Sequence, residues 1–508
     1  MLNKTYKSIS VIFLITIGIK LIDIIKNLIM ASKMGVSNNA DVFSALIAVP
    51  DSLLVLVGID SIRGVVNSEY STLYSDKKFD SIQNSFNNLF KIILIFSFPI
   101  FLLLFIFNNE IISIMFPGFS GMKKDLAVQI SYFIFPVFIF KAIGGFVQSI
   151  YNSTKRFYYP VILSSLISIS MIISIFIPYK NDNIIFNLSI AYLTGNILIV
   201  IFMLANFKNL DLSINFKLPQ FDELTKKIIK SCGSITILVL FNQLFLSSRM
   251  FFASYYGEGS ISSLNYSSAI TTFITALAFN SIFSVLLSNM SSLDLIKDSA
   301  EIKKLYLGTI EIILYIFIPF AGIFILFDTD IIKLFYFRGN FDSEAIVKVS
   351  YPFFWDSLSI ISWILYIIPT AFFLAMKKYK ILTIYGSISY LIGVFLNYYL
   401  SDRFGYYGVA IASFITTLLY GCFLLYKSGK VLNGLGEFYN KLLKIYFCGI
   451  VPFVIIYLLK IYYLSNILEN NSLLLLIAGS FCFIIIYFVC TLFFKVNYLK
   501  NIKNYIKF

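Results

Sequence analysis

Three charged side chains share the first long apolar stretch of the chain, where each charge needs a physical reason. Lys20, Asp23 and Lys26 all lie within residues 8–31. A cation at the centre of a membrane helix costs about 2.5–3.5 kcal/mol on insertion scales, so it indicates a binding site or an ion pair. Asp23 lies three residues from each lysine, and one carboxylate neutralises only one ammonium. Two interpretations follow: the lysines line a cavity that binds an anion, or the three side chains form a structural triplet.

Three further cations lie in apolar stretches. Lys141 is in the middle of residues 127–150, too far from either end to reach water easily, which favours a cavity or an interhelical pair. Arg249, near the end of residues 229–254, either reaches toward the external headgroups or lines a cavity. Arg63 is three residues from Asp60, a spacing that predicts an ion pair on one helix surface.

The acidic residues offer fewer candidates. Asp41 opens the second apolar stretch, where it caps a helix N-terminus or accepts a hydrogen bond from a bound headgroup. Asp356, about ten residues into a long stretch, is a candidate protonatable coupling group. Glu311 is expected to reach water at the inner membrane edge. The chain has no histidine, and its five cysteines show no CxxC spacing, so neither a metal site, a disulfide nor a cofactor is expected.

The elements that position these residues are membrane-spanning helices. The chain is 59% hydrophobic and 13% charged, whereas a soluble domain is closer to half apolar and a quarter charged. Apolar runs of about 20 residues, enough to cross a bilayer as a helix, recur throughout. We expect about fourteen spans, at residues 8–31, 41–66, 90–108, 127–150, 158–178, 184–206, 229–254, 262–290, 304–327, 346–374, 380–400, 404–426, 442–464 and 471–494.

The net charge of +14 is explained by topology rather than by nucleic-acid binding. Loops on the side of the termini hold about 26 Lys and Arg, against about 9 on the other side, which predicts that both termini are cytoplasmic. The N-terminal apolar stretch has no convincing cleavage site, so we expect it to be a retained helix in the inner membrane. The loops are too short for a soluble domain.

Short segments recur about 220 residues apart. The clearest pairs are residues 31–35 with 253–257, residues 110–119 with 330–341, and residues 155–158 with 377–380. Repeats of six spans keep the same orientation, which predicts two halves related by an axis along the membrane normal. The expected organisation is an N-terminal half at 1–206, a cytoplasmic linker at 207–228, a C-terminal half at 229–430, and two additional helices with a tail at 431–508.

At these same residues the sequence resembles the MurJ/MviN family of lipid II flippases, in the superfamily that also holds polysaccharide flippases and multidrug exporters. The matching stretches cover nearly the whole chain: 31–50 (ASKMGVSNNADVFSALIAVP), 117–119 (PGF), 151–160 (YNSTKRFYYP), 253–266 (ASYYGEGSISSLNY), 335–341 (FYFRGNF) and 373–380 (FLAMKKYK). The resemblance implies fourteen spans around a central cationic cavity, and a groove for the polyprenyl tail made by the last two helices.

The resemblance also bears on individual residues. Lys20 and Lys26 fall where the family pattern has two functional arginines, and Arg249 falls where it is often basic. Asp41 matches an acidic position of the family motif. The chain departs from the pattern where the family tends to carry arginines, at Leu54, Val55 and Ala269. A related transporter of another polyprenyl-linked oligosaccharide therefore fits as well as one of lipid II.

We therefore predict a flippase, not an enzyme, which moves a polyprenyl-diphosphate-linked saccharide by alternating access. Its predicted substrate-binding residues are Lys20, Lys26, Asp41, Lys141 and Arg249, with Asp356 for coupling. Its expected partners are that saccharide lipid, membrane lipids and cell-wall synthesis proteins. The alternatives are a polysaccharide-unit flippase or a multidrug exporter, although an exporter of organic cations favours an acidic site. A membrane glycosyltransferase, ligase or polymerase needs catalytic carboxylates or a large external loop, and neither is visible.

Overall fold

Helices are the regular secondary structure of the residues that the computed structural model describes, with no strand among them, which confirms the predicted class of an all-α polytopic membrane protein. The backbone is described for residues 2–55, 57–154, 156, 158–178, 184–210, 212–215, 222–291, 298–432, 434, 436–464, 472–494 and 496. Within these ranges, ten helices are long and apolar enough to cross a membrane, or eleven if one bent pair is counted as a span. The count of fourteen stays a prediction.

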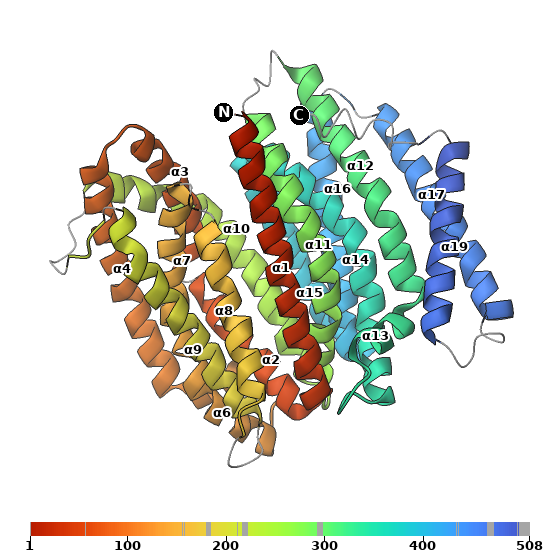
Figure 1. The fold of residues 1–508 in the computed structure, drawn as a ribbon, viewed down its shortest axis with the longest axis horizontal. Helices are drawn as coiled ribbons and strands as arrows, with labels where there is room; N and C mark the ends of the chain where they lie inside the picture. Colours follow the sequence, from red (N-terminus) through yellow and green to blue (C-terminus); the bar gives the residue numbers. More distant parts are fainter. Residues whose placement is uncertain are drawn as a thin grey trace. The chain divides into compact units, whose positions relative to one another are not determined.

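The chain divides into two compact units, Met1–Ser262 and Ser263–Phe508. Unit 1 contains the helices coloured red to yellow-green in Figure 1. They are α1 (Leu2–Met34), α2 (Asn38–Leu54), α3 (Ile59–Ser75), α4 (Phe79–Ile106), α5 (Asn108–Met115), α6 (Gly121–Ile134), α7 (Val137–Ser153), α8 (Tyr158–Ile175), α9 (Ile184–Ala205), the short η1 (Asn206–Leu210) and α10 (Glu223–Ala253).

Unit 2 begins in the first turn of α11 and continues to the C-terminus. Its elements are α11 (Ser260–Ser291), α12 (Ser299–Leu326), α13 (Asp328–Tyr336), α14 (Ser343–Ala375), α15 (Tyr379–Phe404), η2 (Gly405–Tyr407), α16 (Gly408–Val431), α17 (Gly436–Leu459), η3 (Lys460–Leu464) and α19 (Ser472–Phe493). The predicted half boundaries stay a prediction; residues 211 and 216–221 of the expected linker lie outside the described residues.

Two stretches that the sequence predicts as single spans each consist of two helices. Residues 41–66 contain α2 and α3, which are separated at Gly58, where a φ of 68° favours glycine. Residues 127–150 contain the end of α6 and the start of α7, which are separated at Pro136 because proline has no N–H to continue the helix. Hydrophobicity sets the length of a span, whereas these two residues interrupt the helix within it.

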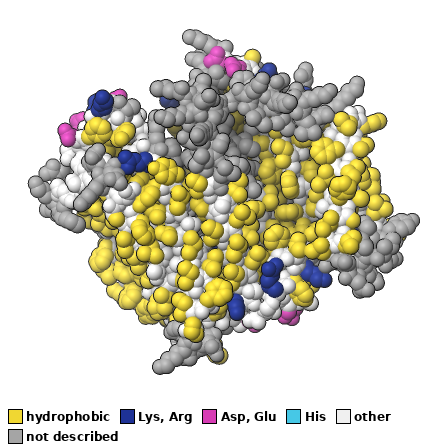
Figure 2. Space-filling model, in the orientation of Figure 1, with side chains coloured by type: hydrophobic (Ala, Val, Ile, Leu, Met, Phe, Trp, Pro, Cys, Tyr) yellow, Lys and Arg dark blue, Asp and Glu magenta, His cyan; other side chains and the backbone are white. Residues whose placement is uncertain are grey.

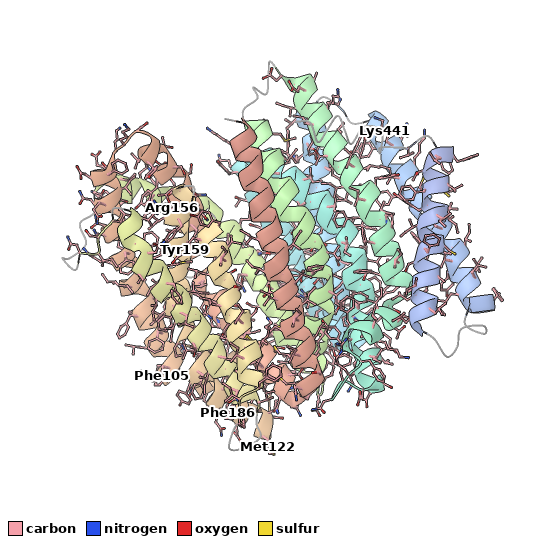
Figure 3. All side chains as sticks on the ribbon, viewed as in Figure 1. Phe105, Met122, Arg156, Tyr159, Phe186 and Lys441 are labelled. Atoms are coloured by element: carbon pink, nitrogen blue, oxygen red, sulfur yellow. The ribbon has the colours of Figure 1, made fainter. Side chains whose placement is uncertain are left out.

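The outer helix faces carry bulky apolar side chains, as contact with lipid requires. Hydrophobic side chains cover most of the face shown in Figure 2, and its visible charged side chains gather near the upper and lower margins. On α4, Phe96 is 60% exposed, and Phe105, labelled in Figure 3, is 42% exposed. In water such a surface would be unfavourable, but hydrocarbon tails are as apolar as these residues.

Glu311 corrects one expectation from the sequence. Its side chain is only 6% exposed, so it does not reach water freely, and it lies 3.7 Å from Lys441. Lys441 is near the start of α17, as Figure 3 shows, and Glu311 is in α12, so the pair joins two helices of unit 2. A carboxylate in the middle of a packed helix is shielded from water by the adjacent helices, and a nearby lysine offsets part of the free-energy cost of its burial.

Candidate functional site

The α1 triplet combines an ion pair with an interhelical hydrogen bond. The Lys20 ammonium lies 3.2 Å from Asp23 Oδ2. Asp23 Oδ1 accepts a hydrogen bond of 2.6 Å from Ser168 Oγ in α8, so the same carboxylate fixes α1 against α8. Lys26 lies three residues further along α1 and is half-buried. The triplet carries two positive charges and one negative charge, so both interpretations of these residues agree with its geometry.

Lys141 has a partner that the sequence analysis did not name. Its ammonium lies 2.6 Å from Asp51 Oδ1, which joins α7 to α2. The same ammonium lies 5.4 Å from the centre of the Tyr192 ring in α9, within range of a cation–π interaction. Lys141 therefore forms an interhelical pair, which is one of the two roles that its mid-span position favours, and a cavity role stays a prediction.

Polar side chains next to this pair connect α2 with α10. The Ser52 hydroxyl accepts hydrogen bonds from Gln243 Nε2 at 2.8 Å and from Ser247 Oγ at 3.2 Å. It also donates to the carbonyl of Ala48 in its own helix. Such bonds satisfy polar groups where water is scarce, and each contributes about 0.6 kcal/mol in membrane helices. We call these residues of unit 1 the α2–α7 polar cluster: Asp51, Ser52, Lys141, Tyr192, Gln243 and Ser247.

Asp41 is fully buried, with 0% of its surface exposed. Its carboxylate lies 2.7 Å from Lys123 Nζ and accepts backbone hydrogen bonds of 2.8 Å from Gly259 and from Ser262. Asp41 therefore does not cap α2, the helix that it was expected to cap; its carboxylate instead accepts from two amides that flank the start of α11. The N-cap of α2 is Ser37, which accepts from the Ala40 N–H. Asp41 is four residues after this cap and already inside the helix, so its side chain is not at the position that caps α2.

The other candidate residues are on α3, α10 and α14. Arg249 is half-buried near the end of α10. Asp356 is buried in α14 of unit 2 and accepts a hydrogen bond from Ser267 Oγ in α11. Arg63 lies 3.3 Å from Asp60, as its spacing predicts, and also donates to Gln148 at 2.6 Å. Lys20, Lys141 and Asp41 each have a different ionic partner: Asp23, Asp51 and Lys123 respectively.

Asp51 is the principal residue that the sequence analysis missed. It follows Pro50 directly, inside a stretch otherwise interpreted through its apolar length and its family motif. A signal was available, because a lysine in mid-span requires an anion and Asp51 is a carboxylate well inside an apolar stretch. Pairing the two required knowledge of which helices are neighbours, and spacing along the chain does not provide it.

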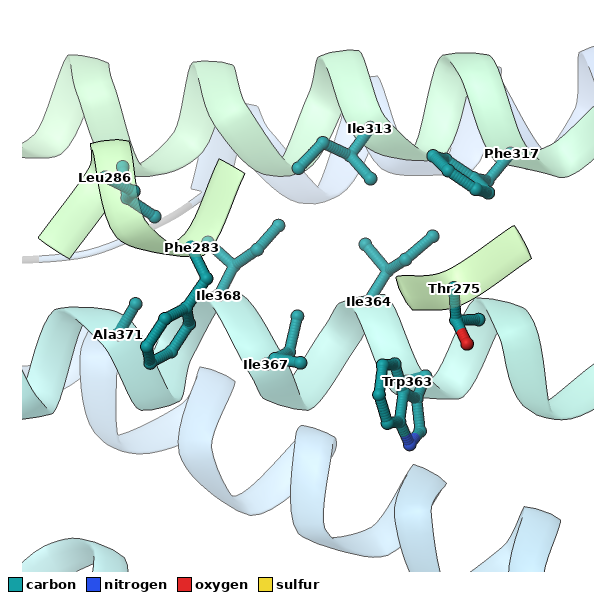
Figure 4. Close-up of a pocket in the computed structure, with 10 residues that line it drawn as sticks. All are labelled: Thr275, Phe283, Leu286, Ile313, Phe317, Trp363, Ile364, Ile367, Ile368 and Ala371. Carbon is teal, nitrogen blue, oxygen red and sulfur yellow. The ribbon is translucent and has the colours of Figure 1, made fainter. Parts of the chain in front are cut away.

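Unit 2 contains a pocket of different character, shown in Figure 4. Its volume is about 400 Å³, open spaces included, and its lining is almost wholly apolar. Ile313 and Phe317 of α12 lie on one side of it, opposite side chains of α14. The lining residues are Thr275, Phe283, Leu286, Ile313, Phe317, Trp363, Ile364, Ile367, Ile368 and Ala371. Among the described residues, no group of three His, Cys, Asp or Glu side chains is placed to hold a metal ion.

Helices of this length and hydropathy define a polytopic membrane protein, and lysine–aspartate pairs join some of these helices to one another. The sequence model of the family described as "Lipid II flippase MurJ" matches residues 30–488. The chain belongs to this family.

Individual relatives agree with this assignment. A "Probable lipid II flippase MurJ" of Rickettsia prowazekii is 27% identical over 457 residues, covering 87% of this chain and 88% of the relative. A protein of the same description from Buchnera aphidicola subsp. Baizongia pistaciae is 23% identical over 469 residues, covering 89% and 90%.

Solved structures agree on the fold. The structure "Lipid II flippase MurJ, inward closed conformation" matches with a TM-score of 0.79 at 22% identity, covering 96% of this chain and 99% of that one. An inward-facing multidrug resistance MATE family transporter of the MOP superfamily matches with a TM-score of 0.66 at 14% identity, covering 82% and 98%. The fold is therefore shared beyond the family.

Proposed function

We propose that this chain is a flippase that moves a polyprenyl-diphosphate-linked saccharide of the lipid II kind across the cytoplasmic membrane by alternating access. Membership of the family supports the substrate class, since the relatives are described as lipid II flippases. The observation that carries the proposal is the presence of lysines within the helices of unit 1, at Lys20, Lys26 and Lys141. Ammonium groups in a site of low dielectric attract a diphosphate strongly.

Lys141 also bears on the arginines that this chain lacks. The family tends to carry arginines at the positions of Leu54 and Val55 of the second span. Lys141 reaches from α7 to Asp51, which is about one turn before Leu54 on α2. A cation on a neighbouring helix thus lies close to the place where the family has its own, which supports an anionic substrate. The alternatives of polysaccharide-unit flippase and multidrug exporter are less favoured, because the family model names lipid II.

The proposal has further parts. Both termini are placed in the cytoplasm, because Lys and Arg are more frequent in the loops on that side. The protein performs transport without chemical conversion, and proteins that make or use the cell-wall precursor are its natural partners. Arg249 contributes a further cation, and Asp356 is the coupling carboxylate. Asp41 accepts a hydrogen bond from the headgroup when its ion pair with Lys123 opens.

Complementation tests the substrate. A strain depleted of its own lipid II flippase should grow when this chain is expressed, and failure despite good membrane expression would favour another glycan.

Reconstituted vesicles test the site. Lys20→Ala and Lys26→Ala should each lower headgroup translocation by tenfold or more, on the order of 1.4 kcal/mol, without loss of folded protein. Lys33→Ala is the matched control, because Lys33 is an exposed lysine in the last turn of the same helix. Unchanged translocation in both cavity variants would contradict the assignment.

A further inference from the structure

The Lys141–Asp51 pair is unequal in its exposure. The Lys141 side chain is 19% exposed, whereas the Asp51 side chain is 56% exposed. Both belong to helices that lie in apolar stretches, α7 within a candidate span and α2 within the bent pair. Ionised side chains at such depth face the bundle interior or a water-filled cavity, because contact with lipid is costly. The carboxylate therefore faces a hydrated space, while the ammonium is sheltered beneath it.

This inequality makes the two partners unequally replaceable. Removing the partner of a sheltered charge typically costs several times more than breaking an exposed ion pair. Lys141 thus requires an anion beside it at all times, whereas Asp51 loses little when water replaces its contact with the lysine. A stronger anion that enters the hydrated space can take the place of Asp51, because Lys141 then keeps an anionic partner and the Asp51 carboxylate is solvated by water.

The neighbouring contacts fix the backbone around the pair. Ser52 is bonded to α10 through Gln243 and Ser247, and the Tyr192 ring lies beside the ammonium from α9. These contacts hold α2, α9 and α10 around Lys141. The Asp51 side chain can therefore rotate away from the ammonium while the helix that carries it remains in place.

We propose that Asp51 is the resident counter-ion of Lys141, which the diphosphate of the substrate displaces on binding and which recaptures the lysine on release. The inference rests on the proposed function and deepens it, since it assigns to one residue the balance between affinity and release. Without Asp51, the ammonium would hold the diphosphate more tightly. Binding would then be stronger and turnover slower, because the carboxylate no longer competes for the lysine.

The experiment uses the full-length protein and a short-chain polyprenyl diphosphate as the binding probe. Asp51→Asn should lower the Kd for the probe by about five- to tenfold, within the usual range of coupling between two ligands. In reconstituted vesicles it should also lower the maximal rate of translocation, while the half-saturating concentration falls. Lys141→Met should weaken binding of the probe by a similar factor. In the double variant, Asp51→Asn should have no further effect, because the lysine for which it competes is absent.

Asp60→Asn is the matched control. Asp60 also pairs with a cation of unit 1, but both side chains of that pair are well exposed, at 46% and 38%, and Arg63 keeps its hydrogen bond to Gln148. Its substitution should change neither affinity nor rate. If Asp51→Asn does not yield folded protein, Asp51→Ser makes the same test with a smaller neutral side chain.

The outcomes separate the two proposals. If the wild type binds the probe and Asp51→Asn binds it equally or more weakly, the counter-ion role is wrong and the proposed function stands. If the wild type fails both to bind the probe and to move the saccharide lipid, the proposed function itself is wrong. Tighter binding with a slower maximal rate in Asp51→Asn, but not in Asp60→Asn, supports the inference.

Discussion

The α2–α7 polar cluster of unit 1 and the pocket of unit 2 differ in the polarity of the side chains that form them. The cluster holds an ammonium and a carboxylate 2.6 Å apart, and Ser52, next to Asp51 in the chain, accepts hydrogen bonds from an amide and a hydroxyl group of α10. The pocket of unit 2 is lined by residues that carry no charge, with Thr275 and Trp363 as its only polar members. An amphipathic substrate needs both environments, because its diphosphate requires cations and its polyprenyl chain requires hydrocarbon.

Exposure separates two kinds of charge within unit 1. Asp41 is fully enclosed by its donors, whereas Lys20 and Asp51 have side chains that are 38% and 56% exposed. An enclosed charge with complete partners stabilises the packed helices around it and reaches a ligand only when those contacts open, whereas an accessible charge is available to a ligand directly. The comparison between the units thus becomes sharper when the structural charges are tested apart from the accessible ones.

The largest effect on stability is expected at Asp41. Asp41→Ala removes the carboxylate that accepts from Lys123 and from two backbone amides of α11 and its N-cap. It also leaves Lys123, which is only 14% exposed, without its anion. Breaking a buried pair in this way costs about 3–5 kcal/mol. The measurement is the midpoint of thermal unfolding in detergent, with Asp125→Ala as control, because Asp125 is an exposed carboxylate on α6, the helix that carries Lys123. Equal midpoints for the two variants would show that Asp41 does not belong to the structural class.

A smaller effect is expected where α9 packs closely on α8 in unit 1. A Cβ on Gly195 would lie 2.7 Å from the Ile167 Cα, so Gly195→Ala must push two backbones apart. Overpacking of this kind costs about 1–3 kcal/mol. It should also displace Tyr192, one turn earlier on α9, from Lys141.

Gly144→Ala in α7 is the control for this substitution. Its Cβ would make an ordinary contact, 3.6 Å from a Val200 methyl group, and alanine favours the helix. The unfolding midpoint should therefore fall for Gly195→Ala and hold or rise for Gly144→Ala. A fall of equal size in both would show that α8 and α9 are not in unusually close contact.

The class of fold was predictable because the length of an apolar run depends only on the residues and on the thickness of a bilayer. The predicted stretch at 346–374 differs from α14 (Ser343–Ala375) by three residues at most. Other helices extend beyond their apolar part: α4 begins at Phe79, eleven residues before the predicted stretch at 90–108, since a helix continues into polar sequence outside the membrane. Composition finds the span and does not find the helix ends.

The candidate site was only partly predictable. The Lys20–Asp23 and Arg63–Asp60 pairs are local, and helix periodicity is enough to predict them. The Lys141–Asp51 pair joins residues 90 positions apart, and Asp41 accepts from residues 218 and 221 positions away. These contacts depend on which helices are neighbours. Without the fold, the sequence indicates that each residue needs a polar partner but does not identify that partner.

Unit 2 has a half-buried carboxyl, Asp328, outside its candidate spans, and its response to pH should be opposite to that of a well-paired acid. Burial raises the pKa of the Asp328 carboxyl at the start of α13. A raised folded-state pKa stabilises the fold below the unfolded value, about 3.9, and this stability is lost as the pH rises through the folded value. Asp328→Asn should therefore raise the unfolding midpoint at pH 7, because it raises the free energy of unfolding by less than about 1 kcal/mol after screening by solvent.

The measurement is the difference in midpoint between wild type and Asp328→Asn from pH 4 to pH 8, so that other titrating groups largely cancel. The difference should be smallest at the acidic end and grow with pH. A difference that shrinks as the pH rises would mean that the Asp328 carboxylate is stabilised in the folded protein.

The smallest effect is expected at the Thr275 hydroxyl, one of the two polar groups in the lining of the unit 2 pocket. The Thr275 hydroxyl bonds only to carbonyls of its own helix, at 3.0 Å to Thr271 and 3.3 Å to Thr272, and those carbonyls already serve the helix. Thr275→Val keeps the shape, so it should change the free energy of unfolding by less than about 0.5 kcal/mol. Ser52→Ala in unit 1 should cost about 1 kcal/mol, because Gln243 and Ser247 lose their acceptor. If Thr275→Val were the more damaging change, the pocket would depend on a polar contact, and the contrast between the α2–α7 polar cluster of unit 1 and the apolar pocket of unit 2 would fail.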